Sequence, residues 1–106
     1  MFINGTWRKA NHQFEVTNPA DGTLISKVFD GGQDEAREAI DAAATAQLSW
    51  GKTTAYERSQ ILYRAYEIML ERKDDLARTM TLEQGKPLKA ALTEVQYGAD
   101  FLLWFA

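Results

Sequence analysis

The spacing of apolar residues changes near residue 30 and divides the chain into two parts. Before that point, short apolar runs and alternating positions are typical of strands. From residue 33, apolar residues recur every three or four positions, as in amphipathic helices. At the start, Phe2-Ile3 and Thr6-Trp7 flank Asn4-Gly5, two residues that tolerate the positive φ angles of a type I′ turn. The sequence therefore predicts a tight β-hairpin at this end.

A second pair of strands is predicted before residue 30. Phe14–Thr17 alternates apolar and polar side chains, as a half-buried strand does, and Thr23–Phe29 returns as its partner. Between them, Asn18–Gly22 has the composition of a turn, because proline presets φ and an Asp-Gly pair can close the bend. His12 is expected to be a solvent-exposed residue of the loop ahead of this pair.

The first two helices carry recognisable signals at their starts. Asp34 and its acidic neighbours mark the first turn of a helix that ends at Trp50, since a helix N-terminus favours negative charge. Thr54 and Glu57 then form a capping-box pattern, in which hydroxyl and carboxylate each bind the backbone N–H of the other residue. A second helix is predicted to follow this box.

Two further helices complete the prediction. We expect a break near Lys73, a left-handed glycine at Gly85 that ends the third helix, and Pro87 at the first position of the fourth. The predicted fold class is α/β, with β-hairpin elements over residues 1–30 and four helices over residues 33–106. We expect a single partial domain, 1–106, truncated within the fourth helix, because Leu102–Ala106 stops without a polar final turn, glycine or proline.

Composition excludes several kinds of partner. Twelve basic against fifteen acidic residues give a net charge of −3 without a basic stripe, which argues against nucleic acid and anionic lipid. The absence of cysteine excludes disulfides and thiolate metal sites. No signal peptide is visible, and no apolar run approaches the roughly 20 residues that span a bilayer. These features predict a cytoplasmic protein with no membrane partner.

Candidate chemistry concentrates at the end of the third helix. Glu83 lies where backbone carbonyls lose their helical partners, and carboxylate and carbonyl oxygens are the ligands that hard cations take. A solvated surface acid is the alternative. Lys86 follows Gly85 without the glycine-rich lead-in of a phosphate-binding loop, so we expect it to neutralise the helix end. No Ser/His/Asp set and no dinucleotide fingerprint is present.

Five segments in register resemble the beginning of the aldehyde dehydrogenase superfamily. They are FINGTW, FEVTNPADGTLISKV, DEAREAIDAAATAQLSW, the arginine-punctuated YERSQILYRAYEIMLERKDDLARTM, and TLEQGKP. Within that superfamily, EVQYGADFLLWFA is most similar to the succinate-semialdehyde dehydrogenase branch. The resemblance covers nearly the whole chain.

The resemblance implies a fold, a reaction and a cofactor. The segment would be the peripheral N-terminal part of a cofactor-binding domain in an enzyme that oxidises an aldehyde, such as succinate semialdehyde, with NAD or NADP. In that chemistry a cysteine thiolate attacks the carbonyl, and a glutamate-activated water deacylates the thioester. This chain has no cysteine, so we expect it to be inactive alone and to bind no cofactor. The implied partners are the remainder of the dehydrogenase chain and, in the parent enzyme, further copies in a homo-oligomer.

The resemblance also implies roles for five residues, none of them catalytic or cofactor-binding. The backbone carbonyls of Val16 and Thr17 and the carboxylate of Glu83 are similar to a monovalent-cation site of some family members. Tyr97 and Phe101 match positions on the helix that borders the substrate channel. The competing hypothesis is a small helical interaction module that binds a partner through the apolar end of the fourth helix.

Overall fold

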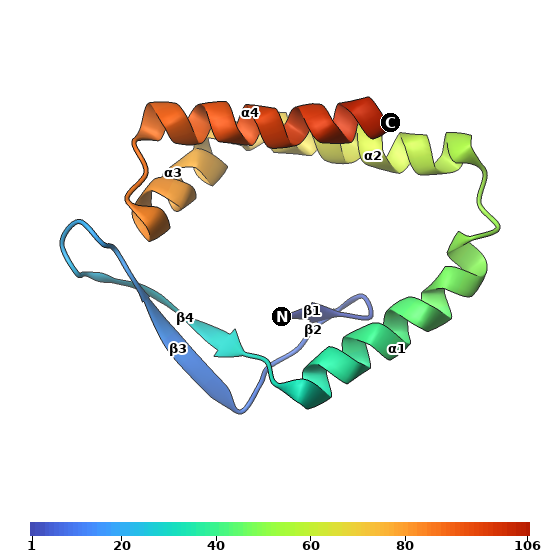
Figure 1. Cartoon of the computed structure of the whole chain (residues 1–106), viewed down its shortest axis with the longest axis horizontal. Coiled ribbons are helices and arrows are strands. Elements are labelled where there is room, and N and C mark those ends of the chain that lie inside the picture. Colours follow the sequence, from blue (N-terminus) through green and yellow to red (C-terminus); the bar gives the residue numbers. More distant parts are fainter. The chain divides into compact units, whose positions relative to one another are not determined.

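The computed structural model describes all residues, 1–106, and its contacts divide the chain into two compact units. Unit 1 contains Met1–Val16 and Ser26–Thr53, and unit 2 contains Thr17–Ile25 and Thr54–Ala106. Figure 1 labels the elements, four short strands followed by four helices, which confirms the predicted fold class. The single partial domain that ends within the fourth helix stays a prediction.

The N-terminal hairpin forms as predicted. Strand β1 (Phe2–Ile3) pairs antiparallel with β2 (Thr6–Trp7). Asn4 and Gly5 between them have φ angles of 50° and 75°, the sign that a type I′ turn requires. The aromatic rings of the two strands pack edge to face, with centroids 5.4 Å apart. The hairpin contacts one helix of unit 1, α1 (Gln33–Trp50), through β1.

The second strand pair forms as predicted, except that its first strand begins two residues earlier and its second is shifted by one residue. Strands β3 (His12–Thr17) and β4 (Leu24–Asp30) form a separate two-stranded sheet. His12 is therefore an exposed strand residue, and its assignment to a loop was wrong. Backbone N–H and C=O groups form the hydrogen bonds between strands, so strand pairing does not require apolar side chains. An exposed strand can therefore extend beyond the alternating apolar residues from which it was predicted.

The turn between β3 and β4 uses the residues that the sequence indicated. The amide of Asn18 donates to the carbonyl of Thr23 at 2.9 Å, and the amide of Gly22 donates to the carbonyl of Asn18 at 2.8 Å. Gly22 has a φ of 74°, which an L-residue adopts only at a cost. The Asp21 carboxylate accepts from the Thr23 amide at 3.0 Å, and this closes the loop on itself.

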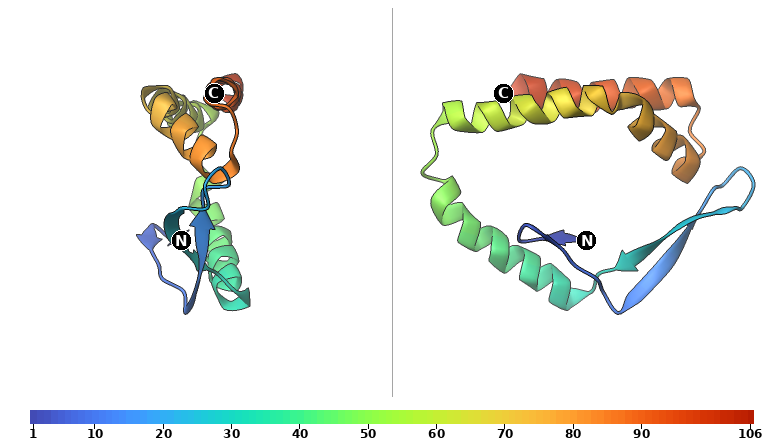
Figure 2. Two further views of the ribbon diagram at one scale, coloured as in Figure 1. Left: turned by 90° about the vertical axis from the view of Figure 1, so that its left-hand side faces the viewer. Right: turned by 180° about the vertical axis from the view of Figure 1, so that it is seen from behind.

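Unit 2 is built around three helices, α2 (Ala55–Glu71), α3 (Lys73–Gln84) and α4 (Leu88–Phe105). Helix α4 packs against both others, and Figures 1 and 2 show it running antiparallel to α2. Its buried residues are small: Ala91, Val95 and Ala99, all at most 4% exposed. Half-buried side chains surround this core: Met69, Leu76, Met80 and Leu92. These inward residues follow the three- and four-residue spacing that predicted amphipathic helices from residue 33.

The helix ends show which local signals were interpreted correctly. Thr54 accepts from the Glu57 amide at 3.2 Å while the Glu57 carboxylate accepts from the Thr54 amide at 2.7 Å, so the predicted capping box forms. Gly85 ends α3 with a φ of 71°, also as predicted. Pro87 is the N-cap of α4 and not its first helical residue, because its ψ is 133° and its carbonyl already accepts from the Ala90 and Ala91 amides.

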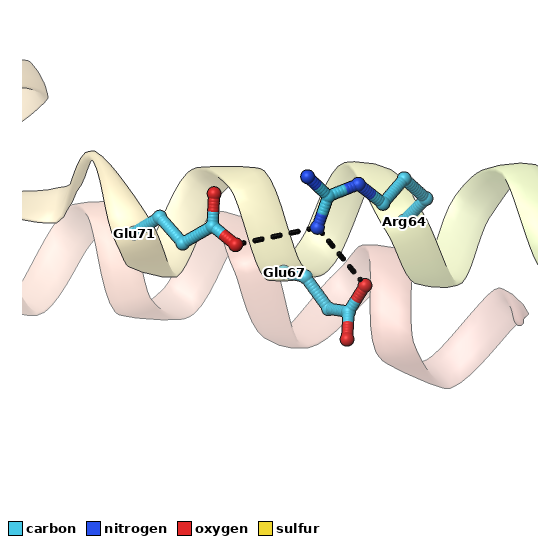
Figure 3. A network of polar contacts seen from close by, with 3 residues as sticks. All are labelled: Arg64, Glu67 and Glu71. Atoms are coloured by element: carbon cyan, nitrogen blue, oxygen red, sulfur yellow. Dashed lines mark hydrogen bonds and ion pairs between the residues drawn. The ribbon is translucent and has the colours of Figure 1, made fainter.

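A charged network covers the exposed side of α2. One nitrogen of the Arg64 guanidinium lies 3.2 Å from the carboxylate of Glu67 and 3.2 Å from that of Glu71 (Figure 3). These contacts raise the pKa of Arg64, first through the hydrogen bond to Glu67. The three side chains are solvent-exposed, and an exposed pair of this kind contributes little stability. None of the four helices combines the length and apolar character that crossing a bilayer requires.

Candidate functional site

The residues of the predicted cation site lie on two kinds of element. Glu83 is an exposed residue in the last turn of α3, and Thr17 is the last residue of β3. Both belong to unit 2, whereas Val16 is assigned to unit 1. Carbonyl and carboxylate oxygens fit a hard monovalent cation. The side chains contain no group of three or more His, Cys, Asp or Glu placed to hold a metal ion, so the site depends on backbone oxygens and stays a prediction.

The segments that carry Thr17 and Glu83 approach each other within unit 2. A Cβ atom added to Gly85 would lie 3.1 Å from Cγ of Pro19, so the tip of the β3–β4 turn packs against the α3–α4 connection. Nearby on α3, the Thr81 hydroxyl oxygen is buried without a hydrogen-bond partner. Other helical threonines, such as Thr79, donate to the carbonyl four residues earlier. The TLEQGKP turn is therefore closely approached by Pro19 at Gly85, while Leu82, Glu83 and Gln84 stay exposed.

Tyr97 and Phe101 lie together on α4, as expected for residues four apart on a helix. Their ring centroids are 4.8 Å apart at an interplanar angle of 79°. Both are substantially exposed, Tyr97 at 63% and Phe101 at 48%. With Asp100, Trp104 and Phe105 they line a shallow depression on this helix. Their role in a substrate channel stays a prediction.

A second depression adjoins Tyr97 and runs to the start of α4. It is lined mostly by apolar surface, and its residues are Lys86, Pro87, Lys89, Ala90, Thr93, Glu94 and Tyr97. We call it the α4 groove. Lys86 forms an ion pair with Glu94, and its expected neutralisation of the end of α3 stays a prediction. The same helix, α4, carries Ala91, Val95 and Ala99 on its opposite face, where it packs against α2 and α3.

Lys89 is the groove residue that the sequence analysis did not single out. It is exposed and takes part in none of the ion pairs of the structure. In the sequence, the spacing of Lys89 from Lys86 and Thr93 only weakly indicates that the three share a helix face. The structure shows that Ala91 and Val95 face inward, and this places Lys89 on the outer side of α4.

A polar chain holds α3 and α4 together beside the depressions. The Lys73 ammonium donates to Oε1 of Gln96 at 2.8 Å, and Nε2 of Gln96 donates to Asp100 at 2.9 Å. Gln96 thus bridges a cation on one helix and a carboxylate on its own helix. This arrangement fixes the amide orientation of Gln96 and orients Asp100 at the edge of the aromatic depression.

The carboxylates with displaced pKa values are structural. The Thr54 backbone N–H, followed by the Thr54 hydroxyl, lowers the pKa of Glu57, and the Gly32 backbone N–H lowers that of Glu35. The pKa of Asp21 is lowered by the Thr23 amide and hydroxyl. Each of these acids caps a helix or closes a turn. None combines burial with a neighbouring nucleophile, as a general acid or base would.

Comparison with known proteins decides the family. Residues 7–106 match the model of the aldehyde dehydrogenase family. The chain belongs to this family. A succinate-semialdehyde dehydrogenase [NADP(+)] of Escherichia coli is 51% identical over 98% of the chain, and a glutarate-semialdehyde dehydrogenase of Pseudomonas putida is 50% identical over 99%. The crystal structure of an NADP-dependent enzyme of E. coli superimposes with a TM-score of 0.95 and 50% identity over 97% of the chain.

The match covers only one part of these dehydrogenases. The chain spans 22% of the length of each of the two relatives and 22% of the crystallised chain. The similarity of this segment to a succinate-semialdehyde and a glutarate-semialdehyde dehydrogenase is almost equal. The family assignment and the resemblance to semialdehyde dehydrogenases are therefore confirmed, while the choice between these aldehydes is left open.

Proposed function

We propose that this chain forms the N-terminal part of an NAD(P)-dependent dehydrogenase that oxidises succinate semialdehyde, or a similar semialdehyde, to the carboxylic acid. The overall reaction consumes the aldehyde, water and NAD(P)⁺ and yields the acid, NAD(P)H and a proton. One observation carries the proposal, namely about 50% identity along the segment to dehydrogenases of two such semialdehydes. The rest of the dehydrogenase would be its main partner, within a cytoplasmic homo-oligomer.

In this proposal the segment supports chemistry that other segments perform. The chain has no cysteine to form a thiohemiacetal, and it lacks a glycine-rich loop to hold a dinucleotide. What it offers is a helix, α4, whose exposed face presents Tyr97, Phe101 and the α4 groove. Residues on such a face can position a substrate without taking part in bond breaking.

The first test asks whether the chain is inactive alone. The purified 106-residue protein is incubated with succinate semialdehyde and either NAD⁺ or NADP⁺, and the absorbance of the reduced nicotinamide is followed. We expect no rate above a protein-free control, because the nucleophile is missing. Reproducible turnover in independent preparations would contradict the proposal.

The second test asks whether the segment serves a dehydrogenase. Residues 1–106 replace the corresponding segment of the E. coli succinate-semialdehyde dehydrogenase, and a matched deletion of that segment is the negative control. We expect an active hybrid and an inactive deletion, since half of the positions are identical and the folds coincide. A soluble, cofactor-bound hybrid without aldehyde oxidation would refute the proposed role.

The second candidate, a helical interaction module, is supported by one observation. Trp104 and Phe105 at the end of α4 are 81% and 71% exposed. An apolar patch of this kind marks a contact surface. The hybrid enzyme of the second test discriminates between the two candidate functions, because an interaction module with an unrelated partner would not restore dehydrogenase activity.

A further inference from the structure

The outer face of α4 is complementary to itself in shape. The small buried residues of this helix face α2 and α3, and positions three or four apart form a stripe on the opposite side. The stripe begins as the α4 groove and continues into an aromatic ridge, made of Tyr97, Phe101 and Trp104, which are 63%, 48% and 81% exposed. A hollow and a ridge therefore follow each other along one helix, and Tyr97 borders both.

The charges along this stripe are separated in the same way. Lys89 lies in the first turn of α4, Asp100 lies in its second half, and neither takes part in an ion pair of the structure. The two residues lie about 16 Å apart along the helix axis, so they cannot pair within one chain. A helix of the same sequence that runs in the opposite direction would bring the two charges together.

We propose that a second copy of this chain covers the outer face of α4, in an antiparallel dimer with twofold symmetry. The inference goes beyond the proposed function, because it concerns association of the 106-residue chain with itself. The twofold axis would cross α4 near Val95, so that Tyr97 of each copy lies opposite Thr93 of the other. In this register Asp100 of one copy meets Lys89 of the other, and the symmetry makes every contact occur twice.

The same register places the aromatic ridge of each copy over the groove of the other. Phe101 lies beside Lys89 and Ala90 of the second copy, whose apolar atoms line the groove. Trp104 lies over Pro87 and over the hydrocarbon stem of Lys86, whose ammonium stays paired with Glu94. Aromatic surface that is exposed in the single chain is thereby buried without breaking an existing ion pair.

The size of this surface determines how tight the dimer is. Helix α4 has 18 residues and is therefore about 27 Å long. The exposed parts of the three aromatic side chains amount to an area on the order of 400 Å² per copy. A stable interface buries about 800 Å² per partner. We therefore expect a weak dimer, with a dissociation constant on the order of 100 µM.

Sedimentation equilibrium of the 106-residue chain, from low micromolar to millimolar concentration, tests the association. We expect a monomer that gives way to a discrete dimer and no larger species, because a twofold contact closes on itself. A chain that stays monomeric throughout would overturn the proposal, and its outer face would then belong to another occupant. Growth beyond the dimer would also overturn it, since that requires a contact that does not close.

A charge exchange tests the register. Lys89→Glu and Asp100→Lys should each weaken the dimer about tenfold, because each change places like charges opposite each other at two symmetric positions. The double variant Lys89→Glu/Asp100→Lys should return to within about threefold of the parent, since the pairs are restored with exchanged signs. Lys52→Glu makes the same charge change at an exposed lysine after α1 and is the matched control. Circular dichroism confirms that each variant keeps its helices.

The direction of the two helices has its own measurement. The chain has no cysteine, so Ala106→Cys carries a single nitroxide label at the end of α4. Antiparallel helices that cross near Val95 should hold the two labels about 33 Å apart, whereas parallel helices would hold them about 10 Å apart. The short distance, or a charge exchange that fails to restore the dimer, would refute the antiparallel α4 pair even if the chain does associate.

Discussion

Replacing Gly85 by alanine should destabilise the chain through two effects that a second glycine can separate. Gly85 has a φ of 71° at the end of α3, and Gly22 has a φ of 74° in the β3–β4 turn. At Gly85 an added Cβ would meet Cγ of Pro19 at 3.1 Å, whereas at Gly22 nothing lies within 4 Å. The backbone cost is therefore common to both substitutions, and only Gly85→Ala adds a steric contact.

The magnitudes follow from these two effects. Placing an L-residue in the left-handed region costs about 1–2 kcal/mol, and we expect this for Gly22→Ala. At Gly85 the contact with Pro19 forces a shift of a few tenths of an ångström between two packed segments. Since overpacking costs about 1–3 kcal/mol in a core, a partly exposed contact should add about 1 kcal/mol. The free energy of unfolding should thus fall by about 2–3 kcal/mol in Gly85→Ala.

Urea unfolding followed by circular dichroism measures the difference. The double variant Gly85→Ala/Pro19→Ala completes a mutant cycle, because alanine at position 19 lacks the Cγ atom that the new methyl group meets. We expect it to recover about 1 kcal/mol relative to the sum of the single changes. Equal losses for Gly85→Ala and Gly22→Ala, with no coupling to Pro19, would show that the turn tip does not pack on the α3–α4 connection.

Three further predictions concern the caps and the exposed aromatic end. Thr54→Ala should lower the free energy of unfolding by about 0.5–2 kcal/mol, and Thr54→Ser should lower it much less, because serine keeps the oxygen that accepts from the Glu57 amide; urea midpoints decide between them. Folding lowers the pKa of Glu57, so the ionised carboxylate stabilises the folded chain above the unfolded pKa of about 4.5, and this stabilisation is lost as the pH falls through the lower folded pKa. In Glu57→Gln, a plot of the urea midpoint against pH should therefore be flatter in this acid range. Trp104, which is 81% exposed, should promote concentration-dependent association, and sedimentation velocity of Trp104→Glu should show less of it at every concentration.

Features that depend on a few neighbouring residues were predictable from the sequence. Asn4-Gly5, the Thr54 box and Gly85 each determine their own backbone geometry, because the required φ angle or cap oxygen is local. His12 was misassigned because a polar residue can extend an exposed ladder. Pro87 was misplaced by one position, since N-cap and first helical residue differ only in ψ.

The candidate site was less accessible to sequence reasoning. Tyr97 and Phe101 were named from the family resemblance alone, and the structure adds that their rings pack together on α4. The cation site stays a prediction from the family resemblance, because it would combine strand carbonyls with a side chain at a helix end and no local pattern encodes such a combination. Lys89 was overlooked because only the structure shows that Glu94 is paired with Lys86 while Lys89 takes part in no ion pair.

The small residues of α4 have a consequence for the direction of its outer side chains. Ala91 and Ala99 are fully buried, and Val95 between them is 4% exposed, so small side chains form the centre of the contact between this helix and its neighbours. Each residue advances about 100° around a helix, so turning α4 by one position would bring either Glu94 or Gln96 to the place of Val95. Rotation of α4 about its own axis would therefore bury a charged or polar side chain in either direction. The alanines on one face thereby set the orientation of Lys89 and Tyr97 on the other.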